Sequence, residues 1–93
     1  MTLSKRAWEH IRERHPEMER YERLVLQTLS EPEVLLRGPL GEGKAVRFWP
    51  ETHLGPKFVV VVFREADGRK KDIITAYFTS DLKRIKGDVV WRA

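Results

Sequence analysis

His10 and Arg14 lie four residues apart, a spacing that places both side chains on one face of a helix. A histidine beside an arginine suits proton transfer next to a phosphate, because the guanidinium holds the anion while the imidazole exchanges the proton. The alternative is a surface histidine in a helix rich in Arg and Glu. We take His10 as a candidate general acid or base and Arg14 as a candidate phosphate ligand.

The other histidines are His15 and His53, and the sequence has no cysteine. His10 and His15 diverge by roughly 140° on a straight helix, so they do not form a metal-binding pair. His15 precedes Pro16, where we expect it to cap the helix or pack at its end. We therefore predict neither a metal nor another cofactor.

Basic and aromatic residues gather in the second part of the chain. Residues 1–32 hold equal numbers of basic and acidic side chains, so the net charge of +4 belongs to residues 33–93. Cations that contact phosphates and rings that stack on bases are the composition expected for RNA contact. The candidates are Lys57, Arg64, Arg69, Lys70, Lys71, Lys83, Arg84 and Lys86, with the rings of Trp49, Tyr77 and Trp91. For residues 69–71 a solvated basic turn is the alternative.

Residues 38–45 come close to the phosphate-binding P-loop pattern, G-x-x-x-x-G-K-[ST]. Ala45 stands where the motif needs a hydroxyl, Pro39 removes a backbone donor, and the following residues alternate like a strand rather than a helix. We interpret the segment as a hairpin turn.

Two helices are predicted at the N-terminus. Ser4 is a suitable N-cap for a helix over residues 5–14, which ends at His15 because the residue before a proline avoids helical geometry. A second helix is expected to begin at Pro16 and to end at residues 30–32. Its apolar stripe comprises Met18, Tyr21, Val25 and Leu29, widened by Leu24 and Leu26.

The remainder predicts β-strands over residues 34–37, 44–49, 57–64, 71–79 and 89–92, with a hairpin turn at 66–69 and a helical turn at 81–85. The expected fold class is α+β: two N-terminal helices packed on one face of a four- to five-stranded antiparallel sheet. Strict alternation along 71–79 places Ile74, Ala76 and Phe78 under the helices. Ile73, Thr75, Tyr77 and Thr79 would then face an open groove, or simply form a solvated sheet face.

Length and composition limit the class of protein. The chain has 93 residues, enough for a single domain over 1–93, and 41% hydrophobic residues, enough for a core. Its longest apolar run, 58–63, is far shorter than the roughly 20 residues of a membrane span. The N-terminal residues are charged and do not resemble a signal peptide, so we expect a cytoplasmic protein without membrane contact. The absence of Asn and the single Gln predict a thermophilic source, with chance composition as the alternative.

Several short strings together resemble small phage- and toxin-associated proteins of the barnase–EndoU–colicin D–RelE-like (BECR) nuclease superfamily. They cover about residues 8–91 and comprise His10-Ile11, Arg14-His15-Pro16-Glu17, Thr28-Leu29, Pro32, Lys57 with 58–62, Ile74-Thr75-Ala76-Tyr77, Gly87 and Trp91. The resemblance implies RNA cleavage without a metal, through attack of the ribose 2′-hydroxyl. It also implies that His10 is the general acid or base, that Arg14 and Lys57 hold the phosphate, that Thr75 and Thr79 position it, and that Tyr77 or Trp91 stacks a base.

These patterns lead to a toxin-type endoribonuclease as the expected function, with RNA as substrate and an antitoxin protein or a second copy as further partner. His10, Arg14, Lys57 and Thr75 are the expected catalytic set, and Arg64, Tyr77, Thr79 and Trp91 the expected substrate-binding set. The alternatives are a non-catalytic RNA- or protein-binding module of the same fold, and an interaction protein whose open face pairs with another chain.

Overall fold

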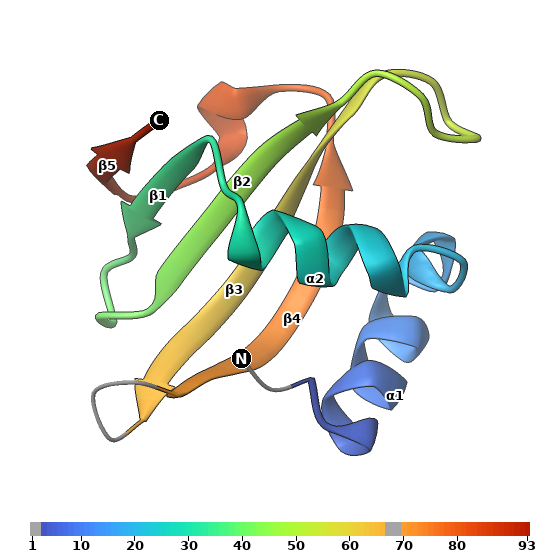
Figure 1. Ribbon diagram of the computed structural model, residues 1–93, viewed down its shortest axis with the longest axis horizontal. Helices are drawn as coiled ribbons and strands as arrows, with labels where there is room; N and C mark the ends of the chain where they lie inside the picture. Colours follow the sequence, from blue (N-terminus) through green and yellow to red (C-terminus); the bar gives the residue numbers. More distant parts are fainter. Residues whose placement is uncertain (1–2, 67–69) are drawn as a thin grey trace.

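The computed structural model describes residues 3–66 and 70–93 and consists of two α-helices, two short 3₁₀ turns and a five-stranded antiparallel sheet (Figure 1). The α+β prediction, with the helices at the N-terminus and packed on the sheet, is confirmed. In chain order the elements are α1 (Lys5–Arg14), η1 (Pro16–Met18), α2 (Glu22–Ser30), β1 (Val34–Arg37), β2 (Gly43–Trp49), β3 (Lys57–Ala66), β4 (Lys70–Thr79), η2 (Leu82–Arg84) and β5 (Asp88–Arg92).

Helix α1 begins and ends where the sequence predicts. The Ser4 hydroxyl accepts a hydrogen bond from the backbone N–H of Ala7 at 3.1 Å, and the helix ends before His15 and Pro16. The prediction of one continuous helix from Pro16 is wrong. Residues 16–18 form a 3₁₀ turn, Tyr21 lies outside helical geometry, and α2 begins only at Glu22. This break turns the chain so that α2 crosses the sheet while α1 runs beside β4 (Figure 1).

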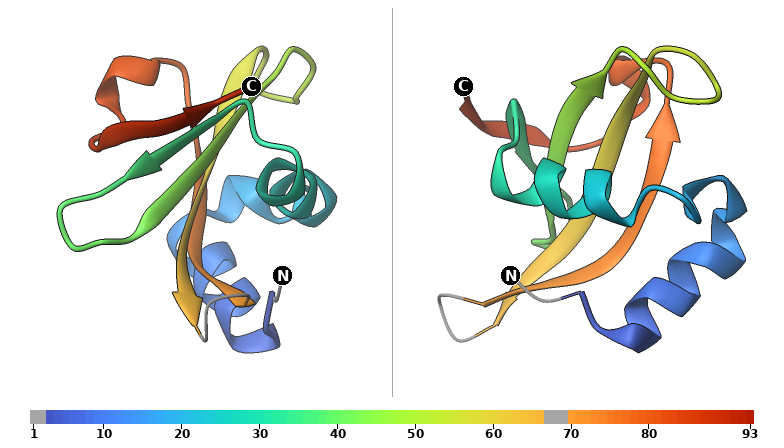
Figure 2. Two further views of the ribbon diagram at one scale, coloured as in Figure 1. Left: turned by 60° about the vertical axis from the view of Figure 1, so that its left-hand side comes forward. Right: turned by 45° about the vertical axis from the view of Figure 1, so that its right-hand side comes forward.

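The strand order is β4-β3-β2-β1-β5. Strands β1 to β4 pair with their neighbours in sequence, whereas the chain after β4 crosses to the far side and adds β5 beside β1. Figure 2 shows α2 on one face of the sheet and the β4–β5 connection on the other. We call these the helix face and the crossover face.

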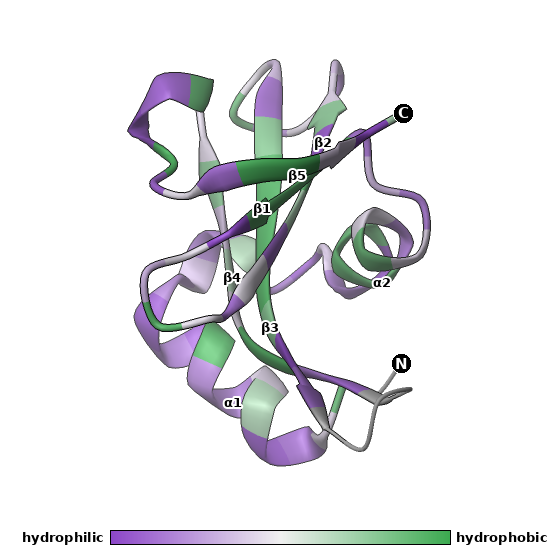
Figure 3. Cartoon of the chain, turned by 90° about the vertical axis from the view of Figure 1, so that its left-hand side faces the viewer, coloured by the Kyte–Doolittle hydropathy of each residue, from purple (hydrophilic) through white to green (hydrophobic). Residues whose placement is uncertain are grey.

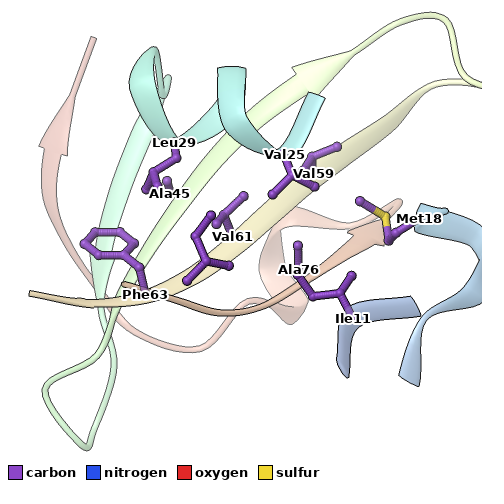
Figure 4. Packing of buried hydrophobic residues seen from close by; sticks show 10 residues of the cluster. Ile11, Met18, Val25, Leu29, Ala45, Val59, Val61, Phe63 and Ala76 are labelled. Atoms are coloured by element: carbon purple, nitrogen blue, oxygen red, sulfur yellow. The ribbon is translucent and has the colours of Figure 1, made fainter. Parts of the chain in front are cut away.

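The main core lies between the helices and the helix face (Figure 4). Alternate residues of β3, Val59, Val61 and Phe63, point into it, as the period of a strand requires. The helical segments contribute Ile11, Met18, Val25 and Leu29, all at most 1% exposed. The Trp49 indole N–H also donates to the buried Thr28 hydroxyl at 3.0 Å, which ties β2 to α2.

The crossover face is partly covered, contrary to the expectation of an open groove. Ile85, just after η2, packs with Leu36, Val46 and Val60 into a second apolar cluster. Tyr77 lies against this cluster. Exposure of the central valines to water would be unfavourable, and Ile85 of the crossing chain covers them.

A β-bulge changes which isoleucine of β4 is buried. Val62 pairs with Thr75 but Phe63 pairs with Ile73, so Ile74 is the extra residue on β4. Ile73 therefore joins the helix-face core at 5% exposure, while Ile74 is 37% exposed. The prediction from strict alternation is wrong for this pair, although Ala76 and Phe78 do lie under the helices.

The segment that resembles a P-loop is the β1–β2 hairpin turn, as interpreted from the sequence. Gly41 has a φ of 83°, which only glycine adopts without strain. Gly43 starts β2, and a Cβ there would lie 2.4 Å from the Phe63 ring. The predicted β3–β4 turn at 66–69 lies largely outside the described residues.

Candidate nucleic-acid interface

His10 and Arg14 are both exposed on α1, whose buried residue is Ile11. Ile11 packs into the helix-face core, so the neighbouring His10 is directed toward solvent. Within residues 3–66 and 70–93 the only ion pair joins His15 and Glu17, so neither His10 nor Arg14 has a carboxylate partner there. Among the described residues, His10 has no partner that would orient it for proton transfer.

Lys57 and Thr75 do not meet. Lys57 pairs with Trp49 and lies on the helix face, where its ammonium donates to the Ser80 hydroxyl. Thr75 pairs with Val62 on the crossover face. Five residues of strand β3 separate these positions, which is about 17 Å. The four side chains expected to be catalytic are therefore not assembled into one site.

Thr75, Tyr77 and Thr79 do share the crossover face, as predicted, because their partners Val62, Val60 and Phe58 alternate along β3. Tyr77 is half-buried, and this burial raises the pKa of its phenol above the ordinary value of 10.0. The phenol is therefore protonated at neutral pH and can donate a hydrogen bond or a proton. Thr79 is occupied otherwise: its hydroxyl accepts from the backbone N–H of Asp81 at 3.3 Å and shapes the turn after β4.

His15 is the residue that the sequence did not place in the site. It caps α1, its backbone N–H donating to the Ile11 carbonyl at 2.7 Å, and its ring centroid lies 5.6 Å from that of Tyr77. The Glu17 carboxylate lies 3.5 Å from its Nδ1, and both side chains remain about one-third exposed. A carboxylate on one ring nitrogen orients a histidine and leaves Nε2 for proton exchange. The run His15-Pro16-Glu17 held this signal, but nothing local indicated Tyr77.

Basic side chains occupy other parts of the crossover face. Arg64 is exposed on the crossover face, two residues along β3 from Val62, the partner of Thr75. Lys44 is on the same face, opposite Val62, and its ammonium donates to the Lys86 carbonyl at 2.6 Å. Lys83, Arg84 and Lys86 are exposed on and after η2, which lies over this face.

We call the part of the crossover face that carries His15, Tyr77, Thr75 and Arg64 the Tyr77 site. Lys44, Lys83, Arg84 and Lys86 lie on or over the same face, toward β2, β1 and β5. Trp91 does not belong to the Tyr77 site. Strand β5 is at the opposite edge of the sheet from β4, four strand spacings or about 19 Å away. Tyr77 and Trp91 therefore cannot contact the same base.

Among the described residues, no group of three or more His, Asp or Glu side chains is arranged to hold a metal ion. None of the helices in this part of the chain is long and apolar enough to span a membrane. No known family model, curated protein or solved structure matches the chain. Its function must therefore be argued from the geometry of its own side chains.

Proposed function

We propose that the protein is a metal-independent endoribonuclease of toxin type whose reaction centre is the Tyr77 site. The observation that carries the proposal is the His15 imidazole, held between the Glu17 carboxylate at 3.5 Å and the Tyr77 ring at 5.6 Å. This places a candidate base beside a candidate acid, and the Tyr77 phenol, whose pKa is raised by burial, is in the protonated state that the acid needs near neutral pH. The resemblance to BECR nucleases supports the same reaction, with His15 in place of His10.

In this proposal His15 Nε2 removes the proton from a ribose 2′-hydroxyl. The 2′-oxygen attacks the adjacent phosphorus, the bond to the 5′-oxygen breaks, and the phenol of Tyr77 protonates that leaving oxygen. The products are a 2′,3′-cyclic phosphate and a 5′-hydroxyl, and the proton on His15 returns to Tyr77 through water. Arg64 and the Thr75 hydroxyl hold the non-bridging oxygens, whose charge grows in the transition state.

RNA binding without cleavage is the second candidate function. The exposed side chains of Lys83, Arg84 and Lys86 favour it, because they provide phosphate contacts whether or not His15 acts as a base. This candidate becomes the conclusion if RNA is bound by the folded protein and remains intact.

Cleavage of a fluorescent RNA oligonucleotide by His15→Gln and His10→Gln distinguishes the reaction centres. Because general acid–base catalysis contributes about 10²- to 10⁴-fold, we expect His15→Gln to lose at least ~10²-fold in rate while the melting temperature stays near that of the unmodified protein. His10→Gln should cleave normally. An RNA with 2′-deoxyribose at the cleaved position should resist the enzyme, because it has no nucleophile.

The reverse result, loss of cleavage in His10→Gln with full activity in His15→Gln, would return the reaction centre to α1 and reject the Tyr77 site. Cleavage of the 2′-deoxy substrate at an equal rate would reject the reaction itself.

A further inference from the structure

Strand β5 ends the sheet beside β1, and its outer edge pairs with no strand of the described residues. All five of its residues are exposed, including Val89, Val90 and Trp91 at 45, 56 and 46%. Figure 3 looks onto this edge, where the middle of β5 is coloured hydrophobic. An exposed apolar edge strand presents free backbone donors and acceptors to another strand.

The opposite edge is protected. Helix α1 and the η1 turn pack against β4, and the charged residues Lys71 and Asp72 lie along that strand. Charged side chains and helical cover are the usual means by which proteins prevent edge pairing. The sheet therefore leaves β5 as its open side.

A groove beside β5 offers room for side chains of an added strand. It has a volume of about 240 Å³ and lies between η2 and strands β1 and β5. Its apolar lining comes from Val34, Leu36, Leu82, Ile85 and Val89. Lys83 and Arg92 also line the groove. An apolar side chain and an acidic one two residues away, on the same face of an added strand, fit this combination.

The charge around β5 selects the kind of partner. Arg37, which pairs with Asp88, also lines a hollow with Lys86 at the end of β5. Together with Lys83, Arg84 and Arg92, these form a basic border that outnumbers the nearby carboxylates of Asp81, Asp88 and Glu33. A second copy would bring two basic borders together, whereas an acidic segment is attracted by them.

We propose that β5 accepts an extended acidic segment of a partner protein as a sixth strand of the sheet. Backbone hydrogen bonds to β5 provide the pairing. On the face of the added strand that meets the groove, an apolar side chain enters the groove, and carboxylates two residues away face Lys83, Lys86 and Arg92. Strand β5 is at the opposite edge of the sheet from β4, which carries Tyr77, so the strand pairing does not depend on the proposed nuclease activity. Lys83 and Lys86 lie on the connection between the two and are shared with the proposed RNA surface.

The test is titration of the isotopically labelled protein with a short blocked peptide of repeating Val-Val-Glu-Glu, followed by NMR. In this repeat each face of the extended chain carries both valine and glutamate. We expect the amide signals of residues 88–92 to shift and the affinity to fall as salt is added. The double variant Lys83→Glu/Lys86→Glu should bind roughly tenfold more weakly, since two attractions become repulsions. The matched variant Lys5→Glu/Arg6→Glu, on the exposed start of α1, should bind like the original protein.

Peptide controls separate strand addition from general attraction. A peptide with proline in place of valine cannot pair as a strand, and one with lysine in place of glutamate has the wrong charge, so both should fail to shift β5. Equal binding of either control, or shifts confined to other elements, would overturn the proposal. So would sedimentation that shows the protein alone pairing through β5, or single-stranded RNA shifting these amides when the acidic peptide does not.

Discussion

At the scale of single residues, Tyr77 combines two properties that affect each other. Its ring is packed between His15 and the apolar cluster under Ile85, and its hydroxyl belongs to the surface proposed to meet RNA. Burial disfavours the phenolate, which is why its pKa is raised. The same burial keeps the phenol protonated, makes it a weaker acid and makes its ionisation costly to the fold.

This cost gives a pH dependence with a definite sign. The unfolded phenol ionises near its ordinary pKa of 10.0, whereas the folded one ionises at higher pH. The ionisation of Tyr77 therefore has no effect on the free energy of unfolding below about pH 9, and it lowers this free energy as the pH rises through the interval between the two pKa values. We expect Tyr77→Phe to lose less stability than the original protein between neutral and strongly alkaline pH.

Urea denaturation at a series of pH values measures this effect as the difference between the two proteins. Lysines that titrate in the same range affect both proteins equally and cancel in the difference. Parallel stability curves above pH 10 would show that Tyr77 ionises as freely in the folded protein as in the unfolded one.

At the scale of elements, the bulge in β4 decides which side chains support the helices. By inserting Ile74 as an extra residue, it lets Ile73 and Ala76 both reach the helix-face core. It also keeps Thr75 and Tyr77 on the crossover face. A regular strand would have to place Ile73 with Thr75 and Tyr77.

The two isoleucines provide a matched pair to test this register. Ile73→Ala should lower the free energy of unfolding by about 2–5 kcal/mol, because it leaves a cavity in the core. Ile74→Ala should cost well under half as much, because its side chain is already partly in water. Chemical denaturation of both variants measures the difference, and a larger loss at Ile74 would mean that β4 continues without the bulge.

At the scale of elements, the sequence predicts those features that depend on neighbouring residues. Ser4 and Pro16 act on their immediate neighbours, so the bounds of α1 could be predicted from them. The bulge and the break before Tyr21 depend on distant contacts. Tyr21 packs edge-on against Phe78, and its hydroxyl is hydrogen-bonded to Nδ1 of His53 at 2.7 Å. Neither partner is near Tyr21 in the chain.

In the candidate site too, local relations could be predicted from the sequence and distant contacts could not. That Thr75, Tyr77 and Thr79 share a face follows from the period of a strand, because the bulge lies before them. That His15 meets Tyr77 follows only from how α1 packs beside β4. The prediction that His10, Lys57 and Thr75 form one site assumed that they share a concave face. Lys57 and Thr75 instead lie on opposite faces of the sheet.

At the scale of the whole molecule, the net charge of +4 is carried by residues 33–93, which include the whole sheet. Lys83, Arg84 and Lys86 are carried by the connection that crosses the sheet, between the Tyr77 site and β5. A phosphate backbone that runs over Tyr77 would pass this connection. Its contribution to RNA binding should therefore be electrostatic and independent of sequence.

Salt titration of RNA binding tests this arrangement. The logarithm of the binding constant should fall linearly with the logarithm of salt concentration, with a slope of about 0.7 for each phosphate contact to a single strand. Lys83→Ala/Lys86→Ala should reduce the slope by up to about 1.4, while Lys5→Ala/Arg6→Ala on α1 should leave it unchanged. Binding by fluorescence anisotropy gives both slopes, and identical slopes for all three proteins would remove the η2 connection from the RNA interface.

The strand order also has a consequence for how the chain reaches this structure. Strands β1 to β4 are joined by hairpins, so each can find its partner nearby, but pairing Leu35 with Trp91 closes a loop that contains nearly all of the sheet. Closing long loops is slow because the entropy of the open chain must be lost before the contacts form. In the folded protein Ile85 packs on Val46 and Val60, and if this contact forms early, it leaves only a short segment to close before β5 meets β1. The residue that covers one face of the sheet is thus also the one best placed to guide the last strand to its partner.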